Sequence, residues 1–447
     1  MKMIIYGATE IGCLLATEFF EDHDVTIIDK EENRTDEFQK LDISFVHGNA
    51  SDSDILKLAD INSADVFIAC TNVDEANIVA CLSAKKMSGI RTICFVNKAE
   101  NKNVLNMEKV DGFLCDFFID YIIWPDELLT QDIFRIVTVA HALDVENFAG
   151  GKARLLEYKV KQGSVLGGKK IKDVGFTPDT IIVGVARDGE IFIPNGDTEI
   201  VEEDKLVFMG TPHALDVLAG TFFHEKEQVK NVAIIGGGSV GAMLAQSLDD
   251  VKIKTKIIET DYQRCQCLSE CLAHALVIHG DGTDLKLLDD EEIGSSDVVI
   301  SVTNNDEKNL LCSLLTKQMG AKKVITRVSK STNISLFEKV GIDVAISPKE
   351  ASINEIRNNL IETDVEILAT VERGQGRIIE ALTPSTFENT TLMNLKLPRK
   401  AIIATVQRGH NVIIPKGLTI LKPNDKLIIF TKDEDSQKII DFFKDKN

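Results

Sequence analysis

The chain has 447 residues, 44% of them hydrophobic, which predicts several globular domains with sizeable cores. Its formal net charge of −20 argues against nucleic acid as a general partner and against direct insertion into anionic lipid, because both depend on clusters of Lys and Arg. No apolar run reaches the roughly 20 residues that span a bilayer, and the start of the chain lacks the features of a secretory signal. We therefore expect a cytoplasmic protein that reaches a membrane only through a partner.

The first part of the chain alternates short apolar strands with amphipathic helices. We expect a helix after each of the first four strands, the first starting at about Ile11, and we place strands at Met3–Tyr6, Val25–Ile28, Ile43–Val46, Val66–Cys70 and Thr92–Val96. This alternation predicts an α/β fold of the Rossmann-like type, a doubly wound parallel sheet with helices on both faces.

A smaller module follows at Ala153–Leu218. Asp188 and Gly189 lie between two β-rich runs, a pattern typical of a tight hairpin. This module should be a small mixed α/β domain with antiparallel strands.

The second half of the chain repeats the first in the same order. The glycine-rich segment MIIYGATEIG matches VAIIGGGSVG, HGNASD matches HGDGTD, and the small modules match at Arg187 with Arg408 and at Pro194 with Pro415. So many matches at a nearly constant separation indicate a duplication. We predict Rossmann-like domains at 1–145 and 229–362 and small domains at 146–225 and 363–447, with a junction between the halves near 220–230.

The second half carries a complete dinucleotide-binding fingerprint directly after an apolar strand. Gly236 would make the tight turn, Gly238 would let the backbone approach a pyrophosphate, and Gly241 would let helix and strand pack closely. Glu259 ends the next strand, where a carboxylate can accept hydrogen bonds from ribose hydroxyls.

Further polar residues follow later strands of the same sheet. Asp281 with Thr283 follows the third strand, and Thr303 with Asn304 follows the fourth. Arg327 and Lys330, after the fifth strand, could supply positive charge for phosphate. The carboxyl ends of parallel strands face the ligand crevice, so these side chains are candidates for one site.

The first half keeps Gly7, Gly12 and the acid Asp29 but departs from the fingerprint elsewhere. Thr9 replaces the middle glycine, and we expect its side chain to point into the path of the pyrophosphate. Asn49 stands where the second half has Asp281, and Phe95 stands where it has Arg327. The first site is thus weakened, specialised for a smaller nucleotide, or empty.

Neither a metal site nor a catalytic group is expected. Cys267, Cys271 and His274 could share a helix face close to Cys265, but no CxxC knuckle is present. A dehydrogenase would need a proton donor or acceptor beside the nicotinamide, whereas His47 and His279 precede glycines at strand ends and suggest a structural role in turns.

The motifs GGGSVG, HGDGTD and TNNDEKN, the acid Glu259 and the paired small modules with Pro194 and Pro415 resemble the TrkA family of potassium-uptake regulatory proteins. That family is built from tandem RCK (regulator of potassium conductance) units, each a TrkA-N Rossmann domain followed by a TrkA-C domain. The resemblance covers essentially the whole chain. It implies a regulatory subunit that binds NAD(H) or ATP/ADP. It also implies a homo-oligomeric ring at the inner face of the plasma membrane, on an integral membrane potassium transporter of the TrkH-like type.

The residue pattern and the resemblance together define the expected nucleotide contacts. In the second half these are Gly236, Gly237, Gly238, Ser239, Val240, Gly241, Glu259, Asp281, Thr283, Thr303, Asn304 and Arg327. In the first half they are Gly7, Ala8, Thr9, Glu10, Ile11, Gly12, Asp29, Asn49 and Thr71. Two alternatives stay open, an NAD-dependent oxidoreductase and a sensor that acts on a different transporter or channel.

Overall fold

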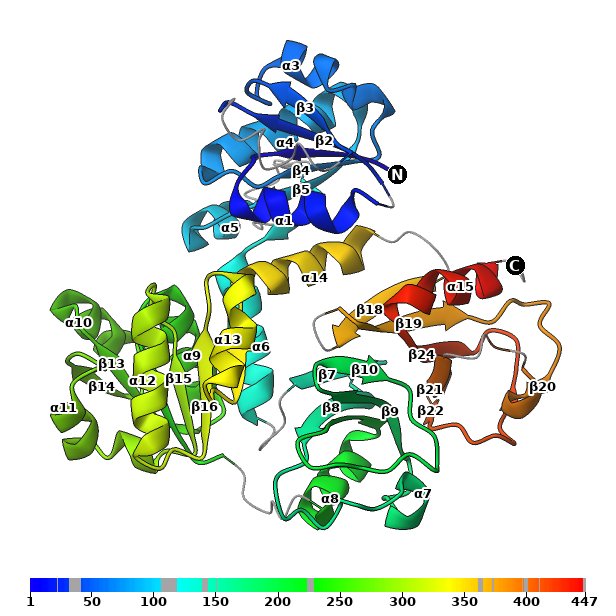
Figure 1. The fold of residues 1–447 in the computed structure, drawn as a ribbon. Coiled ribbons are helices and arrows are strands. Elements are labelled where there is room, and N and C mark those ends of the chain that lie inside the picture. The colour runs from blue at the N-terminus through cyan, green and yellow to red at the C-terminus, as the bar shows by residue number, and fades with distance from the viewer. Residues whose placement is uncertain are drawn as a thin grey trace. The chain divides into compact units, whose positions relative to one another are not determined.

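The structure is a computed structural model that describes residues 1–21, 23–31, 42–105, 119–138, 144–149, 151–222, 229–360, 365–371, 374–395, 397, 401–409 and 411–444. The chain divides into two compact units (Figure 1). Unit 1 comprises Met1–Leu129 and Ser347–Ile353, and unit 2 comprises Thr130–Ile346 and Asn354–Asn447. Among the described residues, no helix is long and apolar enough to cross a membrane.

Unit 1 contains a six-stranded parallel sheet in the order β3-β2-β1-β4-β5-β6. Its strands are β1 (Lys2–Tyr6), β2 (Asp24–Asp29), β3 (Ser44–His47), β4 (Val66–Ala69), β5 (Arg91–Phe95) and β6 (Tyr121–Ile123). Its helices are α1 (Glu10–Phe19), α3 (Ser53–Leu58), η2 (Ile61–Ser63), α4 (Asp74–Ser88), α5 (Ala99–Leu105) and the start of α6 (Pro125–Thr138). The helix that we expected between the second and third strands falls at 32–41, outside the described residues.

Unit 2 contains the matching six-stranded parallel sheet, in the order β14-β13-β12-β15-β16-β17. Its strands are β12 (Asn231–Ile235), β13 (Lys254–Glu259), β14 (Leu276–His279), β15 (Val298–Ser301), β16 (Lys323–Arg327) and β17 (Val344–Ile346). Its helices are α9 (Ser239–Asp250), α10 (Tyr262–Cys271), α11 (Leu285–Asp290), η3 (Ile293–Ser295), α12 (Asp306–Gln318), η4 (Ser331–Asn333), α13 (Ile334–Lys339) and the end of α14 (Pro348–Leu360), whose start belongs to unit 1.

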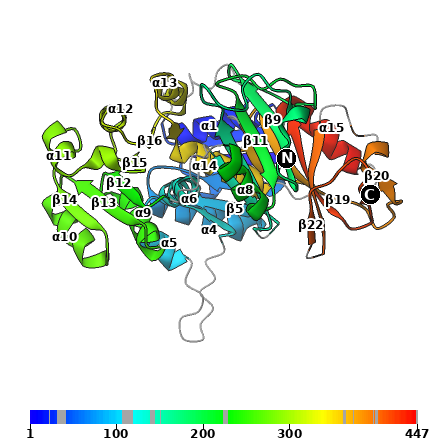
Figure 2. The ribbon, with the colours of Figure 1, turned by 90° about the horizontal axis from the view of Figure 1, so that it is seen from below.

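Helices cover both faces of this second parallel sheet, with α9 and α10 on one face and α11 and α12 on the other (Figure 2). The central strand β15 is buried at every position, as a doubly covered sheet requires. The strand order reverses between β12 and β15, so the carboxyl ends of these strands open onto the crevice where such folds bind ligands.

The two small domains, both in unit 2, each form a five-stranded antiparallel sheet. The first consists of β7 (Asp144–Phe148), β8 (Ala153–Lys159), β9 (Thr180–Arg187), β10 (Glu190–Phe192) and β11 (Lys205–Gly210), with α7 (Ile171–Val174) and α8 (Pro212–Phe222). The second consists of β18 (Val365–Val371), β19 (Gly376–Leu382), β21 (Ala401–Arg408), β22 (Asn411–Ile413) and β24 (Lys426–Lys432), with α15 (Asp433–Lys444). A two-stranded ribbon of β20 (Thr390–Thr391) and β23 (Ile420–Leu421), with η5 (Leu392–Asn394), completes the second.

The hairpin expected in the first small domain is confirmed. Asp188 and Gly189 join β9 to the antiparallel strand β10 and both have positive φ, 54° and 83°, as a type I′ turn requires. The predicted fold class, two tandem Rossmann-like sheets each followed by a small α/β domain, is also confirmed.

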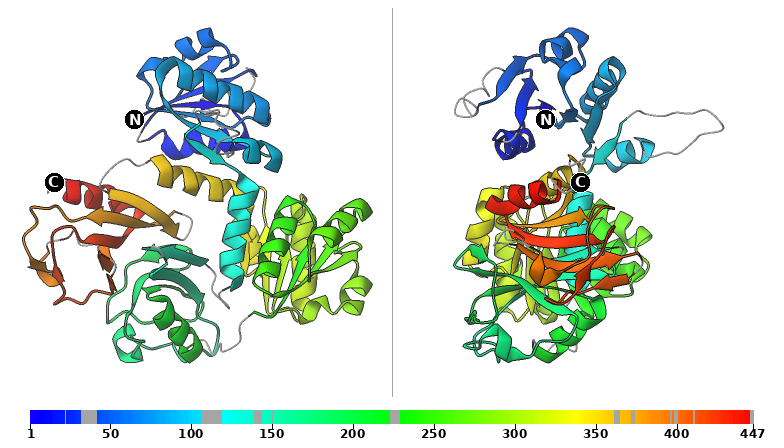
Figure 3. Two further views of the ribbon diagram at one scale, coloured as in Figure 1. Left: turned by 180° about the vertical axis from the view of Figure 1, so that it is seen from behind. Right: turned by 90° about the vertical axis from the view of Figure 1, so that its right-hand side faces the viewer.

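The two small sheets lie side by side (Figure 3), and their buried side chains form one apolar core. Its buried members from the first small domain include Ile191 and Val207, and those from the second include Ile378 and Phe430. A Cβ atom at Gly184 or at Gly376 would lie 2.9 or 2.8 Å from the Phe430 ring, so the ring packs against bare backbone on both sides. Gln375 of the second domain also donates to Gly189 O (2.7 Å) and accepts from Ile191 N (3.1 Å).

Candidate nucleotide-binding site

Two of the three glycines in the second fingerprint are required by the protein itself. Gly236 has φ +113°, which favours glycine, and a Cβ there would lie 3.0 Å from Thr303 N. A Cβ on Gly241 would lie 1.9 Å from Gly236 O, which excludes any side chain unless the helix shifts. These two residues set the tight turn and the close packing of α9 on β12, as the sequence predicts.

The middle glycine, Gly238, is required neither by its backbone conformation nor by its packing. Its φ of −68° suits any residue, and a Cβ there would meet nothing within 4 Å. Gly238 is the N-cap of α9 and provides no side-chain hydrogen bond to the helix. The space in front of the α9 N-terminus is therefore kept clear, and backbone amides at a helix N-terminus favour an anion such as phosphate.

Glu259 is held beside this loop at the end of β13. Its buried carboxylate accepts from Gly237 N (2.7 Å) through Oε2, and from Asp261 N (2.8 Å) and Thr260 Oγ1 (3.1 Å) through Oε1. Burial alone would raise the pKa of this carboxyl, but the hydrogen bonds from Asp261, Gly237 and Thr260 outweigh it and lower that pKa. The group is an ionised acceptor at neutral pH, suited to ribose hydroxyls.

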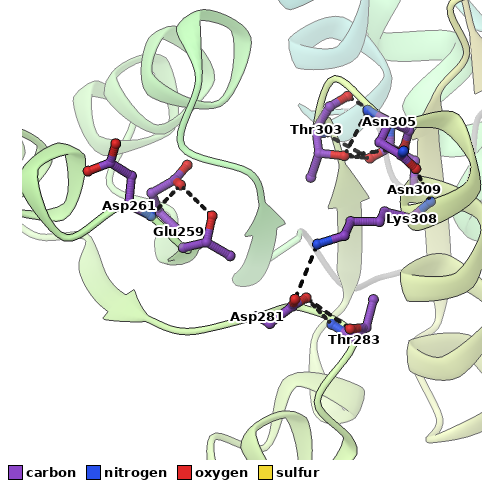
Figure 4. A network of polar contacts seen from close by, with 9 residues as sticks. Glu259, Asp261, Asp281, Thr283, Thr303, Asn305, Lys308 and Asn309 are labelled. Carbon is purple, nitrogen blue, oxygen red and sulfur yellow. Dashed lines mark hydrogen bonds and ion pairs between the residues drawn. The ribbon is translucent and has the colours of Figure 1, made fainter.

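Asp281 lies at the far side of the crevice and is paired with a cation (Figure 4). Its Oδ1 accepts from Thr283 N (3.0 Å) and Thr283 Oγ1 (2.9 Å), and its Oδ2 lies 3.2 Å from Lys308 Nζ. These contacts, led by the Thr283 amide, lower the pKa of Asp281. Lys308 was missed by the sequence reasoning, although its place in TNNDEKN, on the first turn of the helix after β15, is a signal that could have revealed it.

Asn309 clamps the ends of two neighbouring strands. Its Oδ1 accepts from Thr303 N (2.9 Å) and Thr303 Oγ1 (2.6 Å), and its Nδ2 donates to Thr303 O (2.9 Å) and Arg327 O (3.1 Å). Arg327 in turn donates to Asn304 Oδ1 (2.7 Å). The expected residues Thr303, Asn304 and Arg327 are thus brought together, while the exposed Lys330 precedes η4.

The first half repeats the frame of this site. Gly7 has φ +115°, and a Cβ on Gly12 would lie 1.9 Å from Gly7 O. Asp29 Oδ2 accepts from Ala8 N (2.6 Å), as Glu259 accepts from Gly237. Thr71 donates to Asn77 through its amide (2.9 Å) and its hydroxyl (2.6 Å), as Thr303 does to Asn309.

Thr9 lies differently from our expectation. Its backbone conformation, φ −75° and ψ 172°, is close to that of Gly238, but its hydroxyl donates to Cys70 O (2.9 Å) and accepts from Gly12 N (3.3 Å). The hydroxyl is therefore turned into the protein and not into the phosphate path, because it finds buried backbone partners there. It caps α1 and occupies an amide that α9 leaves without a side-chain cap.

Uncharged groups replace the Asp281–Lys308 pair in the first half. The Tyr6 hydroxyl donates to Asn49 Oδ1 (2.7 Å), and Ala76 stands at the position of Lys308. Phe95, at the position of Arg327, is buried and carries no charge. Tyr6 was also missed, since a tyrosine in an apolar strand gives no signal that its hydroxyl reaches the crevice.

The histidines and cysteines near these loops have structural surroundings. His47 and His279 each place Nε2 against a backbone carbonyl, of Lys30 (2.8 Å) and of Thr260 (3.0 Å), which agrees with a role in turns. Cys267 and Cys271 are exposed on α10. Within the described part of the chain, no three His, Cys, Asp or Glu side chains are grouped so that they could hold a metal ion.

Comparison with known proteins agrees with this architecture. The TrkA-N domain model matches residues 3–115 and 232–348, and the TrkA-C domain model matches 155–222 and 377–444. The chain is 37% identical over 451 residues to Trk system potassium uptake protein TrkA homolog 2 of Methanosarcina mazei, covering 99% of this chain and 100% of the relative. It is 32% identical to TrkA of Vibrio alginolyticus, covering 96% and 95%.

Among solved structures, the fold is similar to the GsuK RCK domain (TM-score 0.62, 19% identity, 99% of this chain and 95% of that chain). It is equally similar to the GsuK channel bound to NAD (TM-score 0.62, 19% identity, 99% and 79%). With both domain models matched twice and relatives aligned over nearly their full length, the chain belongs to the TrkA family.

Proposed function

We propose that this protein is a nucleotide-sensing regulatory subunit of a potassium-uptake system. Its relatives are named Trk system potassium uptake proteins, and a structure of the same fold is a channel bound to NAD. The observation that carries the proposal is the clear space at Gly238 in front of the α9 N-terminus, beside the ionised Glu259. Neither the backbone conformation nor the packing requires glycine at position 238. The close approach of a ligand pyrophosphate to the protein backbone is the reason that remains for a glycine there.

The ligand class is an adenine nucleotide, NAD(H) or ATP/ADP. Glu259 would hold the ribose, the α9 amides the phosphates, and Asp281, Lys308 and Arg327 the groups farther along the crevice. Each of the last three already has a polar partner, and Figure 4 shows the Asp281–Lys308 pair, so nucleotide binding would rearrange existing contacts.

The two sites should differ in affinity. The second has the clear path at Gly238 and the cations Lys308 and Arg327, whereas the first has a capped helix, Ala76 and Phe95. One lost charge-assisted contact corresponds to a loss of about tenfold or more in affinity.

The test is isothermal titration of NADH, NAD⁺, ATP and ADP into wild type, Glu259→Ala and Asp29→Ala. Glu259→Ala should lose the tightest binding, and Asp29→Ala, the matched control in the other half, should keep it. Loss of the tightest binding in Asp29→Ala would reverse the assignment of the two sites.

Regulation requires a membrane partner, which we infer to be an integral potassium transporter of the TrkH-like type, bound by a ring of copies of this chain at the cytoplasmic face. Nucleotide can control such a partner only if it binds one arrangement of the ring more tightly than another. Co-purification with a potassium transporter from the native host, followed by nucleotide-dependent potassium flux in proteoliposomes, tests this. A potassium flux that does not change with nucleotide in either wild type or Gly238→Ala would contradict this regulatory role.

An oxidoreductase is the alternative from another class. The histidines at matching positions, His47 and His279, are engaged with turn carbonyls and do not favour it. Steady consumption of NADH with a simple carbonyl substrate, abolished by Gly238→Asp, would establish the alternative.

A further inference from the structure

A lysine from the second half of the sequence lies against the first nucleotide-binding loop, within unit 1. Lys349 is the second residue of α14, and Ser347–Ile353 belong to unit 1. Its Nζ lies 2.5 Å from Glu10 Oε2, and its side chain is only 17% exposed. Glu10 is the first residue of α1, directly after Thr9, and its side chain is 52% exposed.

This position matters because of the charge that a nucleotide would bring to it. Phosphates at the α1 N-terminus would add negative charge next to the Glu10 carboxylate, which repels them. Lys349 is the cation that pairs with that carboxylate. The second half has Ser239 at the position of Glu10, and the first half has Asp126 at the position of Lys349, so the pair is specific to the first site.

We propose that Lys349 is a phosphate-binding residue of the first site, and that a nucleotide phosphate replaces Glu10 as its partner. The proposal rests on the proposed function, since it needs nucleotide at the Gly7–Gly12 loop. Glu10 then acts as an internal competitor that lowers the affinity of this site for phosphate. Lys349 provides positive charge at a site that has lost two cations, with Ala76 and Phe95 in place of Lys308 and Arg327.

The helix that carries Lys349 connects the first site to another part of the chain. The same helix continues from Lys349 to Leu360, and the chain then leads to β18 of the second small domain. Exchange of the partner of Lys349 would therefore act on a helix that both units share.

The test isolates the first site and varies only the ion pair. In a Glu259→Ala background, which weakens the second site, ADP and adenosine are titrated into Glu10→Gln, Lys349→Gln and the double variant. Lys349→Gln should weaken ADP binding by about tenfold, and Glu10→Gln should tighten it by several-fold, because a competing carboxylate is removed. The double variant should resemble Lys349→Gln, and adenosine, which has no phosphate, should bind all of them equally.

Lys2→Gln is the matched control. Lys2 Nζ lies 2.6 Å from Asp60 Oδ2, with side chains 25% and 62% exposed, at the amino end of β1 and so away from the glycine loop. The Lys2→Gln substitution should lower the melting temperature about as much as Lys349→Gln does, and it should leave ADP binding unchanged.

A purely structural ion pair would give the opposite result. Glu10→Gln and Lys349→Gln would then lower the melting temperature alike and leave ADP affinity unchanged, which overturns the proposal. Absence of ADP binding in the Glu259→Ala background, with binding in wild type, also overturns it but leaves the proposed function standing. Absence of any nucleotide binding in wild type overturns the proposed function itself.

Discussion

Gly238 and Thr9 occupy the same place in the two halves and share almost the same backbone conformation. The difference between them lies in the side chain that Thr9 carries and Gly238 lacks. The Thr9 hydroxyl caps its own helix and binds Cys70 O, whereas Gly238 leaves the α9 N-terminus without a side-chain cap. A single hydroxyl thus occupies one amide at the α1 N-terminus, whereas α9 has no such side-chain cap.

Gly238→Ala separates ligand binding from folding. Its Cβ would meet nothing within 4 Å, so we expect the free energy of unfolding to change by no more than about 1 kcal/mol. Nucleotide affinity should fall by about tenfold or more. Gly241→Ala is the control with the reverse pattern, since its Cβ would lie 1.9 Å from Gly236 O and should destabilise the fold by about 3 kcal/mol or more. Equal melting temperatures for the two variants would contradict the assignment of Gly238 to ligand binding and of Gly241 to folding.

The lowered pKa of Glu259 makes a pH-dependent contribution to stability. A carboxyl whose pKa is lower in the folded state stabilises the fold above its unfolded pKa, about 4.3, and this contribution is lost as the pH falls through the folded value. Glu259→Gln should therefore lower the unfolding midpoint at pH 7, and the difference from wild type should shrink below about pH 4. A difference that is constant across this range would show that the charge of Glu259 has no part in it.

At the scale of elements, an ion pair between a partly exposed arginine and a buried aspartate joins a hairpin to a loop in each small domain. Arg408 binds Asp425 with both Nε and Nη2 (each 2.7 Å), and Asp425 is fully buried. Arg187 and Asp204 form the same two-pronged pair in the first domain, at 2.7 and 2.8 Å. Because the carboxylates also accept backbone amides, from Lys422 and Val201, they organise the loop before the next strand.

Asp425→Ala should destabilise the second small domain by about 1–3 kcal/mol, because it removes the buried acceptor of Arg408 and of the Lys422 amide, while the 35% exposed guanidinium can still turn to water. Lys426→Gln, which removes the half-exposed partner of Glu380, should cost less than about 1 kcal/mol. Chemical denaturation of the full chain measures both. Comparable costs for the two variants would mean that burial does not set the strength of these pairs.

At the scale of the whole molecule, the apolar core shared by the two small sheets joins the two halves of the sequence. Phe430 is central to it, lying between the bare backbones of Gly184 and Gly376. Phe208, by contrast, lies in a core made of first-domain residues alone. The two phenylalanines are equally buried and so provide a matched pair.

Phe430→Ala and Phe208→Ala should each destabilise the protein by about 3–5 kcal/mol, the usual cost of an aromatic cavity. Only Phe430→Ala should increase hydrogen exchange across the domain boundary, in β9 and β10 of the first small domain. Exchange increased solely within 376–432 would show that the two sheets do not stabilise each other.

The sequence by itself determined the duplication, the alternation of strands and helices, the structural roles of Gly236 and Gly241, and the places of the two strand-end acids beside the glycine loops. These features obey local rules, namely hydrophobic periodicity, the φ angles open to glycine, and the shared edge at which parallel strands end. A residue whose type is common for its position in a strand or helix gave no comparable signal in the sequence. Among such residues, Lys308 came closest to being predicted.

Only the tertiary structure decided the inward turn of Thr9, the bond from Tyr6 to Asn49, the core around Phe430, and the pairing of Lys349 with Glu10. Each depends on which residues far apart in the chain become neighbours. A hydroxyl or an ammonium group takes the nearest suitable partner after packing has placed it, and no periodicity within a single element records that choice.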